Sequence, residues 1–136
     1  MKQDRITTLL YVPVYAQWIP QFMPSNDGWV ANITYTFHDN LLASIPCNPV
    51  MTGNFPLIPR TVHFTNLGQY TIYMTMGPRQ MPLNPGMDVY QNISPTTPQI
   101  LLRASQRDAV LFCELFASEQ NIAMAPATLQ QLRSPQ

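Results

Sequence analysis

Charged side chains are what this sequence has least of. Lysine, arginine, aspartate and glutamate together make up 10% of its 136 residues, against about 25% in a typical soluble domain. Seven basic and seven acidic residues cancel to a formal net charge of +0. The basic residues are scattered along the chain, so they form no positive stripe of the kind that nucleic-acid phosphates require. We therefore expect no direct binding to nucleic acid.

Cysteine and long apolar runs are also scarce. The two cysteines, Cys47 and Cys113, are too few for a disulfide framework. Cys113 lies inside an apolar run and is expected to act as a small buried hydrophobe. A Cys47–Cys113 bridge is possible on parity alone, but a reducing compartment disfavours it. No apolar run approaches the roughly 20 residues of a membrane-spanning helix, so we expect no membrane span.

The N-terminal residues imitate a signal peptide only in part. Lys2 and Arg5 precede an apolar run, as basic residues do in a secretory leader. However, Asp4 lies among these basic residues and Pro13 interrupts the apolar run. We therefore expect the protein to be made and assembled in a cytosol.

No catalytic or metal-binding constellation is evident. His38 and Asp39 are adjacent, so on a strand they would face opposite sides of a sheet. His63 alternates with apolar neighbours, which is typical of a strand-surface or satisfied core residue. Glu114 is expected either to face outward or to pair with Arg103 across a hairpin. No CxxC or HxxxH spacing occurs, so we expect neither an enzyme nor a cofactor or metal site; a chance zinc site would need His38, His63, Cys47 and Cys113.

Proline and neutral polar residues take the place of the missing charges. The chain contains 14 prolines, and threonine, asparagine and glutamine supply a polar but nearly uncharged surface. A free monomer usually keeps mixed charges and a net charge away from zero for solubility. Formal neutrality therefore favours a subunit packed permanently against neighbours, and a merely polar β domain remains the alternative.

The stretch from Thr61 to Phe116 predicts an antiparallel sheet. It contains four alternating or apolar runs, each bounded by turn residues. The runs are TVHF, QYTIYMTM, QILLRA and AVLFCELF. Residues 29–37 alternate in the same way and predict a further half-buried strand, and a short strand or turn is expected at residues 41–45.

Two turns within this stretch are predicted from specific residues. Asn66 and Gly68 tolerate the left-handed backbone of a tight hairpin turn. Pro85 presets the first angle of a turn, and Gly86 permits a positive angle at the next position. All four residues are expected to be structural.

The expected fold class is all-β: an antiparallel β-sandwich or single jelly roll with an extended N-terminal arm and a C-terminal tail. Residues 1–28 are expected to form the arm because their prolines disfavour helix and central strand; the alternative is an edge strand at about Leu9 to Tyr15, followed by a loop packed on its own domain. Residues 29–116 form the sandwich, and residues 117–136 form the tail. The prolines between Pro46 and Pro59 predict a long irregular connection.

The runs TVHFTNLGQYTIYM, MPLNPGMDVY and ILLRAS…AVLFCELF together resemble a pattern recurrent in small bacteriophage virion proteins. The resemblance covers Thr61 to Phe116. It implies a β-sandwich subunit of a phage particle, such as a minor capsid, decoration, vertex or spike-base protein. It implies no active site.

The expected function is therefore structural, in a virion assembled in the host cytoplasm. The expected partners are copies of the chain and other virion proteins, contacted by apolar residues of the arm and the proline-rich connection. Those residues are Tyr11, Tyr15, Trp18, Phe22, Phe55 and Leu57. The alternative is a receptor- or carbohydrate-binding module of a phage spike or fibre, using Trp18, Trp29 or Tyr90. A jelly-roll metalloenzyme is a third possibility.

Overall fold

The structure, a computed structural model, describes residues 18–26, 28–52 and 55–119. Every regular element in these ranges is a β-strand, which confirms the predicted all-β class. The strands are β1 (Met23–Ser25), β2 (Gly28–Phe37), β3 (Leu42–Pro46), β4 (Val50–Thr52), β5 (Phe55–Asn66), β6 (Ile72–Met76), β7 (Arg79–Leu83), β8 (Asp88–Asn92), β9 (Gln99–Ala104) and β10 (Ala109–Glu119). Within the described residues, no helix is long and apolar enough to cross a membrane.

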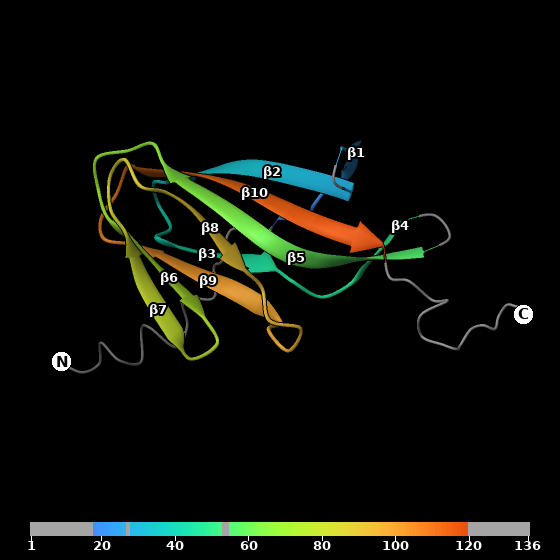
Figure 1. Ribbon diagram of the computed structural model, residues 1–136. Helices are drawn as coiled ribbons and strands as arrows, with labels where there is room; N and C mark the ends of the chain where they lie inside the picture. The colour runs from blue at the N-terminus through green and yellow to red at the C-terminus, as the bar shows by residue number, and fades with distance from the viewer. Residues whose placement is uncertain (1–17, 27, 53–54, 120–136) are drawn as a thin grey trace, which may run out of the picture.

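The strands form two antiparallel sheets (Figure 1). The larger sheet has the order β1-β2-β10-β5-β4, and β8 also pairs with β5. The smaller sheet has the order β3-β9-β6-β7. The expectation of antiparallel pairing is confirmed at every strand pair described.

Eight of the strands pair in a nested series. The innermost pair is β6 with β7, joined by a tight turn at Gly77 and Pro78. Around it, β5 pairs with β8, β3 with β9, and β2 with β10. The chain is thus a long ribbon folded double, and successive pairs of this ribbon alternate between the two sheets. Contacts of β10 with β5 and of β9 with β6 join the pairs within each sheet.

A single hydrophobic core lies between the sheets. Because successive side chains of a strand point to opposite faces, every second residue of β3, β6, β9 and β10 is buried. The largest fully buried side chains come from both sheets: Phe37, Phe64, Ile45, Leu57, Ile72, Met74, Leu83, Ile100, Leu102, Leu111, Leu115 and Val62. Cys47 and Cys113 are buried and free, so Cys113 occupies the core position that its apolar strand predicts.

The Asn66 turn is not the hairpin turn expected from the sequence. It connects β5 to β6, which lie in different sheets, so it is a corner between the layers. Neither Asn66 nor Gly68 has a positive φ. Gly68 is needed for a different reason: a Cβ at this position would lie 2.9 Å from the backbone nitrogen of Val110.

Asn66 stabilises this corner through its side chain. It is buried, and its Nδ2 donates to the carbonyl oxygens of Leu83 (2.7 Å) and Tyr70 (2.9 Å). Its Oδ1 accepts from the N–H of Gly68 at 3.0 Å. Leu83 belongs to the smaller sheet, so one side chain links the two layers.

The expected hairpin of residues 99–104 and 109–116 is also wrong, because β9 and β10 lie in different sheets. Glu114 is therefore on another sheet from Arg103, whose guanidinium lies 4.7 Å over the ring of Tyr73. At the Pro85-Gly86 turn, the N–H of Met87 donates to the carbonyl of Asn84 at 2.9 Å and Gly86 has a φ of 85°.

The proline-rich connection expected between residues 46 and 59 contains strands β4 and β5. Pro56 of β5 pairs with Met51 of the short strand β4 but lies beyond the last β10 pair, Leu57 with Glu119, so β5 is an edge on that side and a missing donor is tolerated. Pro59 lies opposite Ala117 at a register shift, where Arg60 is the extra residue of a β-bulge. Edges and bulges are the positions in a sheet that accommodate proline, so these prolines do not interrupt it.

The described strands also cross the expected domain boundaries. β1 lies within the predicted arm and pairs with β2, and β10 continues to Glu119. Trp18 and Phe22, also in the predicted arm, pack against the core. The rest of the predicted arm and tail lies outside the described residues.

Candidate functional site: the outer face of the larger sheet

We define the outer face of the larger sheet as the side chains of β2, β10, β5 and β8 that point away from the core. They are Val30, Asn32, Thr34, Thr36, Thr61, His63, Thr65, Asp88, Tyr90, Asn92, Val110, Phe112, Glu114, Phe116 and Ser118. Register places Glu114, His63 and Tyr90 side by side on three neighbouring strands. Phe112 and Phe116 flank Glu114 along β10. Neutral side chains predominate, and the ionisable groups lie together.

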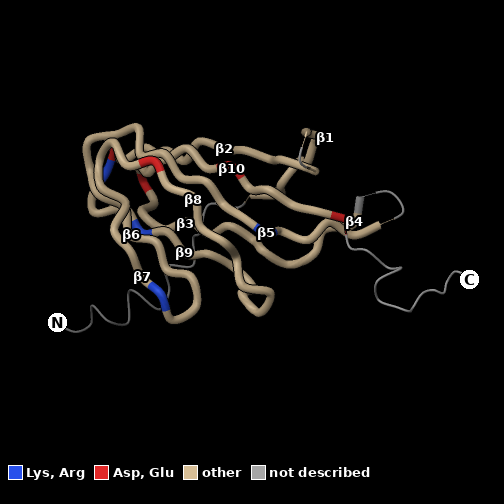
Figure 2. Tube along the Cα trace, in the orientation of Figure 1, with Lys and Arg blue, Asp and Glu red and all other residues tan. Residues whose placement is uncertain are grey.

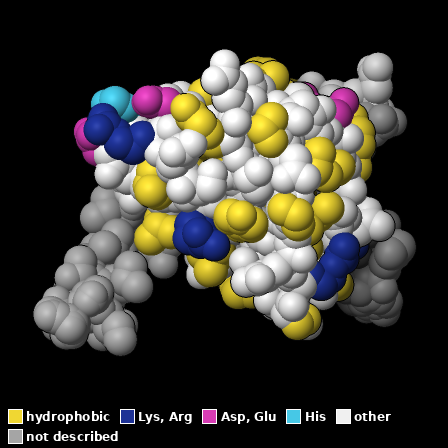
Figure 3. Space-filling model, turned by 90° about the vertical axis from the view of Figure 1, so that its left-hand side faces the viewer, with side chains coloured by type: hydrophobic (Ala, Val, Ile, Leu, Met, Phe, Trp, Pro, Cys, Tyr) yellow, Lys and Arg dark blue, Asp and Glu magenta, His cyan; other side chains and the backbone are white. Residues whose placement is uncertain are grey.

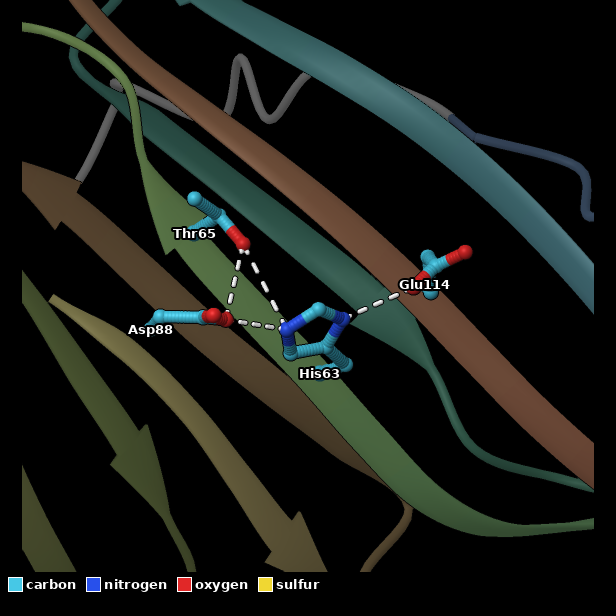
Figure 4. A network of polar contacts seen from close by, with 4 residues as sticks. All are labelled: His63, Thr65, Asp88 and Glu114. Atoms are coloured by element: carbon cyan, nitrogen blue, oxygen red, sulfur yellow. Dashed lines mark hydrogen bonds and ion pairs between the residues drawn. The ribbon is translucent and has the colours of Figure 1, made fainter.

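His63 is the centre of a polar network on this face (Figure 4). Its Nδ1 lies 2.7 Å from Oε1 of Glu114 on β10. Its Nε2 contacts Oδ1 of Asp88 on β8. The side chains of His63 and Glu114 are 12% and 27% exposed, so their contact is partly shielded from solvent, whereas the side chain of Asp88 is 62% exposed. We call His63, Thr65, Asp88 and Glu114 the His63 cluster.

Two further side chains support the histidine. The hydroxyl of Thr65 donates to Oδ1 of Asp88 at 3.1 Å and lies 3.4 Å from Nε2 of His63. The ring of Tyr90 stacks on the imidazole. Tyr90 itself is 62% exposed and lies 6.3 Å from Phe116, measured between ring centroids.

The pKa of His63 reflects two opposed effects. Burial lowers the pKa, but hydrogen bonds to Glu114 and Asp88 and the charges of both carboxylates outweigh burial and raise it above 6.5. The same contact acts on Asp88: the hydrogen bond with His63, then the one with Thr65, lowers the pKa of its carboxyl below 3.8. Both ring nitrogens face carboxylate oxygens, which fits the imidazolium form in which both donate.

This geometry argues against general-base catalysis. A hydroxyl, an imidazole and a carboxylate occur in the order Thr65, His63, Glu114, as in hydrolase triads. However, Asp88 faces the nitrogen that would accept the proton, and Thr65 donates to Asp88 instead. An imidazolium held between two carboxylates has no lone pair to offer. The cluster is therefore a clamp that joins β8, β5 and β10.

The described residues contain no group of three His, Cys, Asp or Glu side chains that could hold a metal ion. The four residues of the chance zinc site do not share a face: Cys113 enters the core, whereas His63 faces outward.

No family model, curated protein or solved structure matches this chain. A hollow lies beside the outer face of the larger sheet. This hollow is open to solvent, has a volume of about 440 Å³ and is lined by Arg60, Thr61, Tyr90, Phe116, Ala117 and Ser118.

The residues expected to contact neighbouring subunits are dispersed. Leu57 is fully buried within its own chain, which corrects the expected contact role. Trp18 and Phe22 pack partly against the core, and the ring of Phe55 lies 6.0 Å from that of Trp29. Tyr11 and Tyr15 lie outside the described residues.

A second histidine cluster lies at the end of β2. His38 and Asp39 follow the strand in a bend, so the expected opposition across a strand does not apply, and they lie 3.8 Å apart. Nδ1 of His38 is 3.0 Å from Asp108, and Nε2 is 2.9 Å from Nη2 of Arg107. All four side chains are exposed, and exposed pairs of this kind contribute about 0–1 kcal/mol.

Sequence reasoning missed the His63 cluster. The partners of His63 lie 25 and 51 residues further along the chain, so only the strand pairing brings them together. The sequence did contain one indication: polar and apolar residues alternate along this strand, and the alternation places His63 on the same face as Thr61 and Thr65.

Proposed function

We propose that the protein is a structural subunit of a viral particle, specifically of a bacteriophage, and that its fold is a β-sandwich of the single jelly-roll type. The nested strand pairing carries this proposal. Eight strands folded as a doubled ribbon, with successive pairs alternating between two sheets, are the arrangement expected of a jelly roll. Jelly rolls recur in viral capsid and lectin domains.

The character of the outer face supports the assembly role. Its ionised groups, His63, Asp88 and Glu114, are paired with one another inside the chain. Burying these three side chains against a neighbour would therefore leave none of their charges without a partner, which is the main penalty of burying ionic groups. Charged positions are few along the described part of the chain (Figure 2). Figure 3 shows the end of the molecule at the left of Figure 1, where basic, acidic and histidine side chains gather at one corner and neutral or hydrophobic side chains cover most of the rest.

The proposed mechanism is burial of this neutral face between subunits. Removing 1,000 Å² of apolar surface from water corresponds to roughly 25 kcal/mol before association costs are subtracted. Phe112, Phe116 and Val30 supply the largest apolar side chains of the outer face. The proposed partners are copies of this chain and other virion proteins, assembled in the host cytoplasm.

The mass of the native protein in solution tests this proposal. Light scattering and native mass spectrometry of the full chain, alone and with proteins that co-purify, are expected to detect stable oligomers. A protein that stays monomeric at high concentration and co-purifies with no virion protein would contradict it.

A receptor- or carbohydrate-binding module of a phage spike or fibre is the second candidate. It is favoured by one observation, the exposed ring of Tyr90 beside an open hollow. Of the other aromatic residues considered, Trp18 lies against Tyr35 and Trp29 lies against Phe55. Binding to a glycan array by a protein that forms no oligomers would favour this second function over the first.

A further inference from the structure

The hollow at the end of β10 combines three kinds of side chain. Tyr90 and Phe116 present aromatic rings, Thr61 and Ser118 present hydroxyls, and Arg60 supplies a cation. Its volume of about 440 Å³ falls within the range of roughly 300–1,000 Å³ typical of small-molecule sites. The hollow is therefore large enough for a ligand of one or two sugar rings.

Arg60 is positioned for an anion. It is the extra residue of the β-bulge opposite Phe116 and Ala117, so its side chain leaves the regular row of the strand. Its Nε donates to Oγ of Ser118 at 3.1 Å, which orients the guanidinium at the hollow. Among the described residues, no carboxylate forms a salt bridge with Arg60. The planar edge of a guanidinium binds a carboxylate through two parallel hydrogen bonds.

The other Arg–aromatic pair shows how this site differs. On the smaller sheet, the guanidinium of Arg103 lies 4.7 Å over the ring of Tyr73, so the cation covers the ring. At the hollow the cation is bound to Ser118 instead, and Tyr90 is 62% exposed. The stack on His63 fixes the Tyr90 ring, which lowers the entropy lost when a ligand packs against it.

We propose that this hollow is a binding site for a sugar that carries a carboxylate, such as a uronic acid. Its carboxylate pairs with Arg60, its apolar C–H face packs against Tyr90 and Phe116, and its hydroxyls exchange hydrogen bonds with Thr61 and Ser118. The requirement for both an aromatic surface and a cation distinguishes this ligand class from neutral sugars and from simple anions. This site specifies a ligand for the second candidate function and rests on it. Because Thr61, Tyr90, Phe116 and Ser118 belong to the outer face, assembly through this end of the face would cover the hollow, so the ligand is proposed for the unassembled chain.

A titration of the full chain with three probes tests the proposal. The probes are methyl glucuronide, methyl glucoside, which carries a hydroxymethyl group in place of the carboxylate, and acetate, which lacks the sugar. We expect the glucuronide to bind with a dissociation constant on the order of 1 mM, and the other two at least about tenfold more weakly. Amide signals of Thr61 and Ser118 in nitrogen–proton NMR spectra are expected to shift.

Matched variants assign the binding to this hollow. Arg60→Gln is expected to abolish the preference for glucuronide over glucoside, and Tyr90→Leu to weaken binding of both sugars. Arg103→Gln removes an arginine beside a tyrosine on the other sheet and is expected to change neither. The same spectra report whether each variant is folded.

Equal binding of glucuronide and glucoside by the unmodified protein would overturn the proposal, as would binding of acetate as tight as that of the glucuronide. Absence of any shift at concentrations well above 1 mM would do the same. These three outcomes need no variant, so a misfolded variant leaves the test intact.

Discussion

The imidazole of His63 lies almost parallel to the ring of Tyr90, with centroids 4.1 Å apart and 5° between the ring planes. The two residues are directly paired across β5 and β8. An imidazolium over an aromatic ring is attracted by the electrons of the ring, and its two N–H groups point sideways at carboxylates. The stack and the two ionic contacts therefore act on one residue, and His63 binds its neighbouring strands from both sides.

Replacing His63 with glutamine is expected to lower the free energy of unfolding by about 1–3 kcal/mol, because its charge-assisted hydrogen bond to the partly buried Glu114 is lost. The contact with the exposed Asp88 is screened by solvent and is not counted in this figure. Urea denaturation measures the change. His38→Gln is the matched control: that side chain is 56% exposed, so a change within about 0.5 kcal/mol is expected. Equal effects of the two substitutions would contradict the inference that the His63 cluster stabilises the pairing of β8, β5 and β10.

The contribution of the His63 cluster is expected to depend on pH in a defined way. Folding raises the pKa of His63, so its contribution is complete below 6.5 and is lost as pH rises through the higher pKa of the folded state. Folding lowers the pKa of Asp88, so its contribution is complete above 3.8 and is lost as pH falls through the lower folded value. The difference in unfolding free energy between the unmodified protein and His63→Gln should therefore be greatest between pH 3.8 and 6.5. A difference that grew from pH 6.5 to pH 9 would refute this assignment.

Asn66→Ala is expected to destabilise the protein by about 2–4 kcal/mol, because two carbonyls and one N–H at a buried corner lose their partner. Thermal and urea unfolding measure the effect. Asn84→Ala is the control, since Oδ1 of Asn84 accepts one exposed hydrogen bond from Thr71, and its cost should stay below about 1 kcal/mol. A small effect at Asn66 would mean that water replaces its side chain.

Gly68 and Gly86 are expected to respond differently to the same pair of substitutions. Gly68→Ala places a methyl group against the backbone of Val110 and should cost about 1–3 kcal/mol, with Gly68→Asn at least as costly. Gly86 has open space but a φ of 85°, so Gly86→Ala should cost roughly 1–2 kcal/mol. Asparagine tolerates that backbone better, so Gly86→Asn should recover part of the loss. Unfolding curves of the four variants distinguish steric from conformational strain.

Phe112→Lys is expected to convert the proposed oligomer to monomer without unfolding it. Phe112 lies on the outer face between Thr34 and Thr65, where a lysine would place an unpaired charge in a buried interface. Leu101→Lys makes the same kind of change on the smaller sheet and should leave assembly intact. Light scattering measures mass and circular dichroism checks the fold; dissociation by Leu101→Lys alone would move the interface to the other sheet.

Local features of the fold were predictable from the sequence, whereas the strand pairing was not. Alternation in residues 29–37 and 109–116 identified strands because one face of each is buried. The hairpins assumed between successive runs were wrong, because turn residues such as Asn66 and Gly68 also suit a corner between sheets. Pro56 and Pro59 were assigned to a loop because the bulge and the edge strand that accommodate them depend on distant partners.

In the candidate site, too, local features were predictable from the sequence and contacts between strands were not. The outward phase of His63 could be predicted, but its contacts with Asp88 and Glu114 arise only from pairing of β5 with β8 and β10. Leu57 was expected at an interface because a proline-rich segment was assumed to be irregular. In the strand that forms instead, its side chain points into the core.

The nested pairing also determines when this protein can fold during its synthesis. Trp29 pairs with Ala117, so the first long strand emerges from the ribosome well before its partner has been translated. Until β10 is made, the apolar face of β2 is exposed and can associate nonspecifically with other chains. Pairing between strands so far apart in the sequence also makes folding slow. Of the described strands, β10 is translated last and lies between β2 and β5 in the larger sheet, so a chain cut short before it leaves two unjoined sheet edges. Translation must therefore pass β10 before β2 and β5 are protected from aggregation.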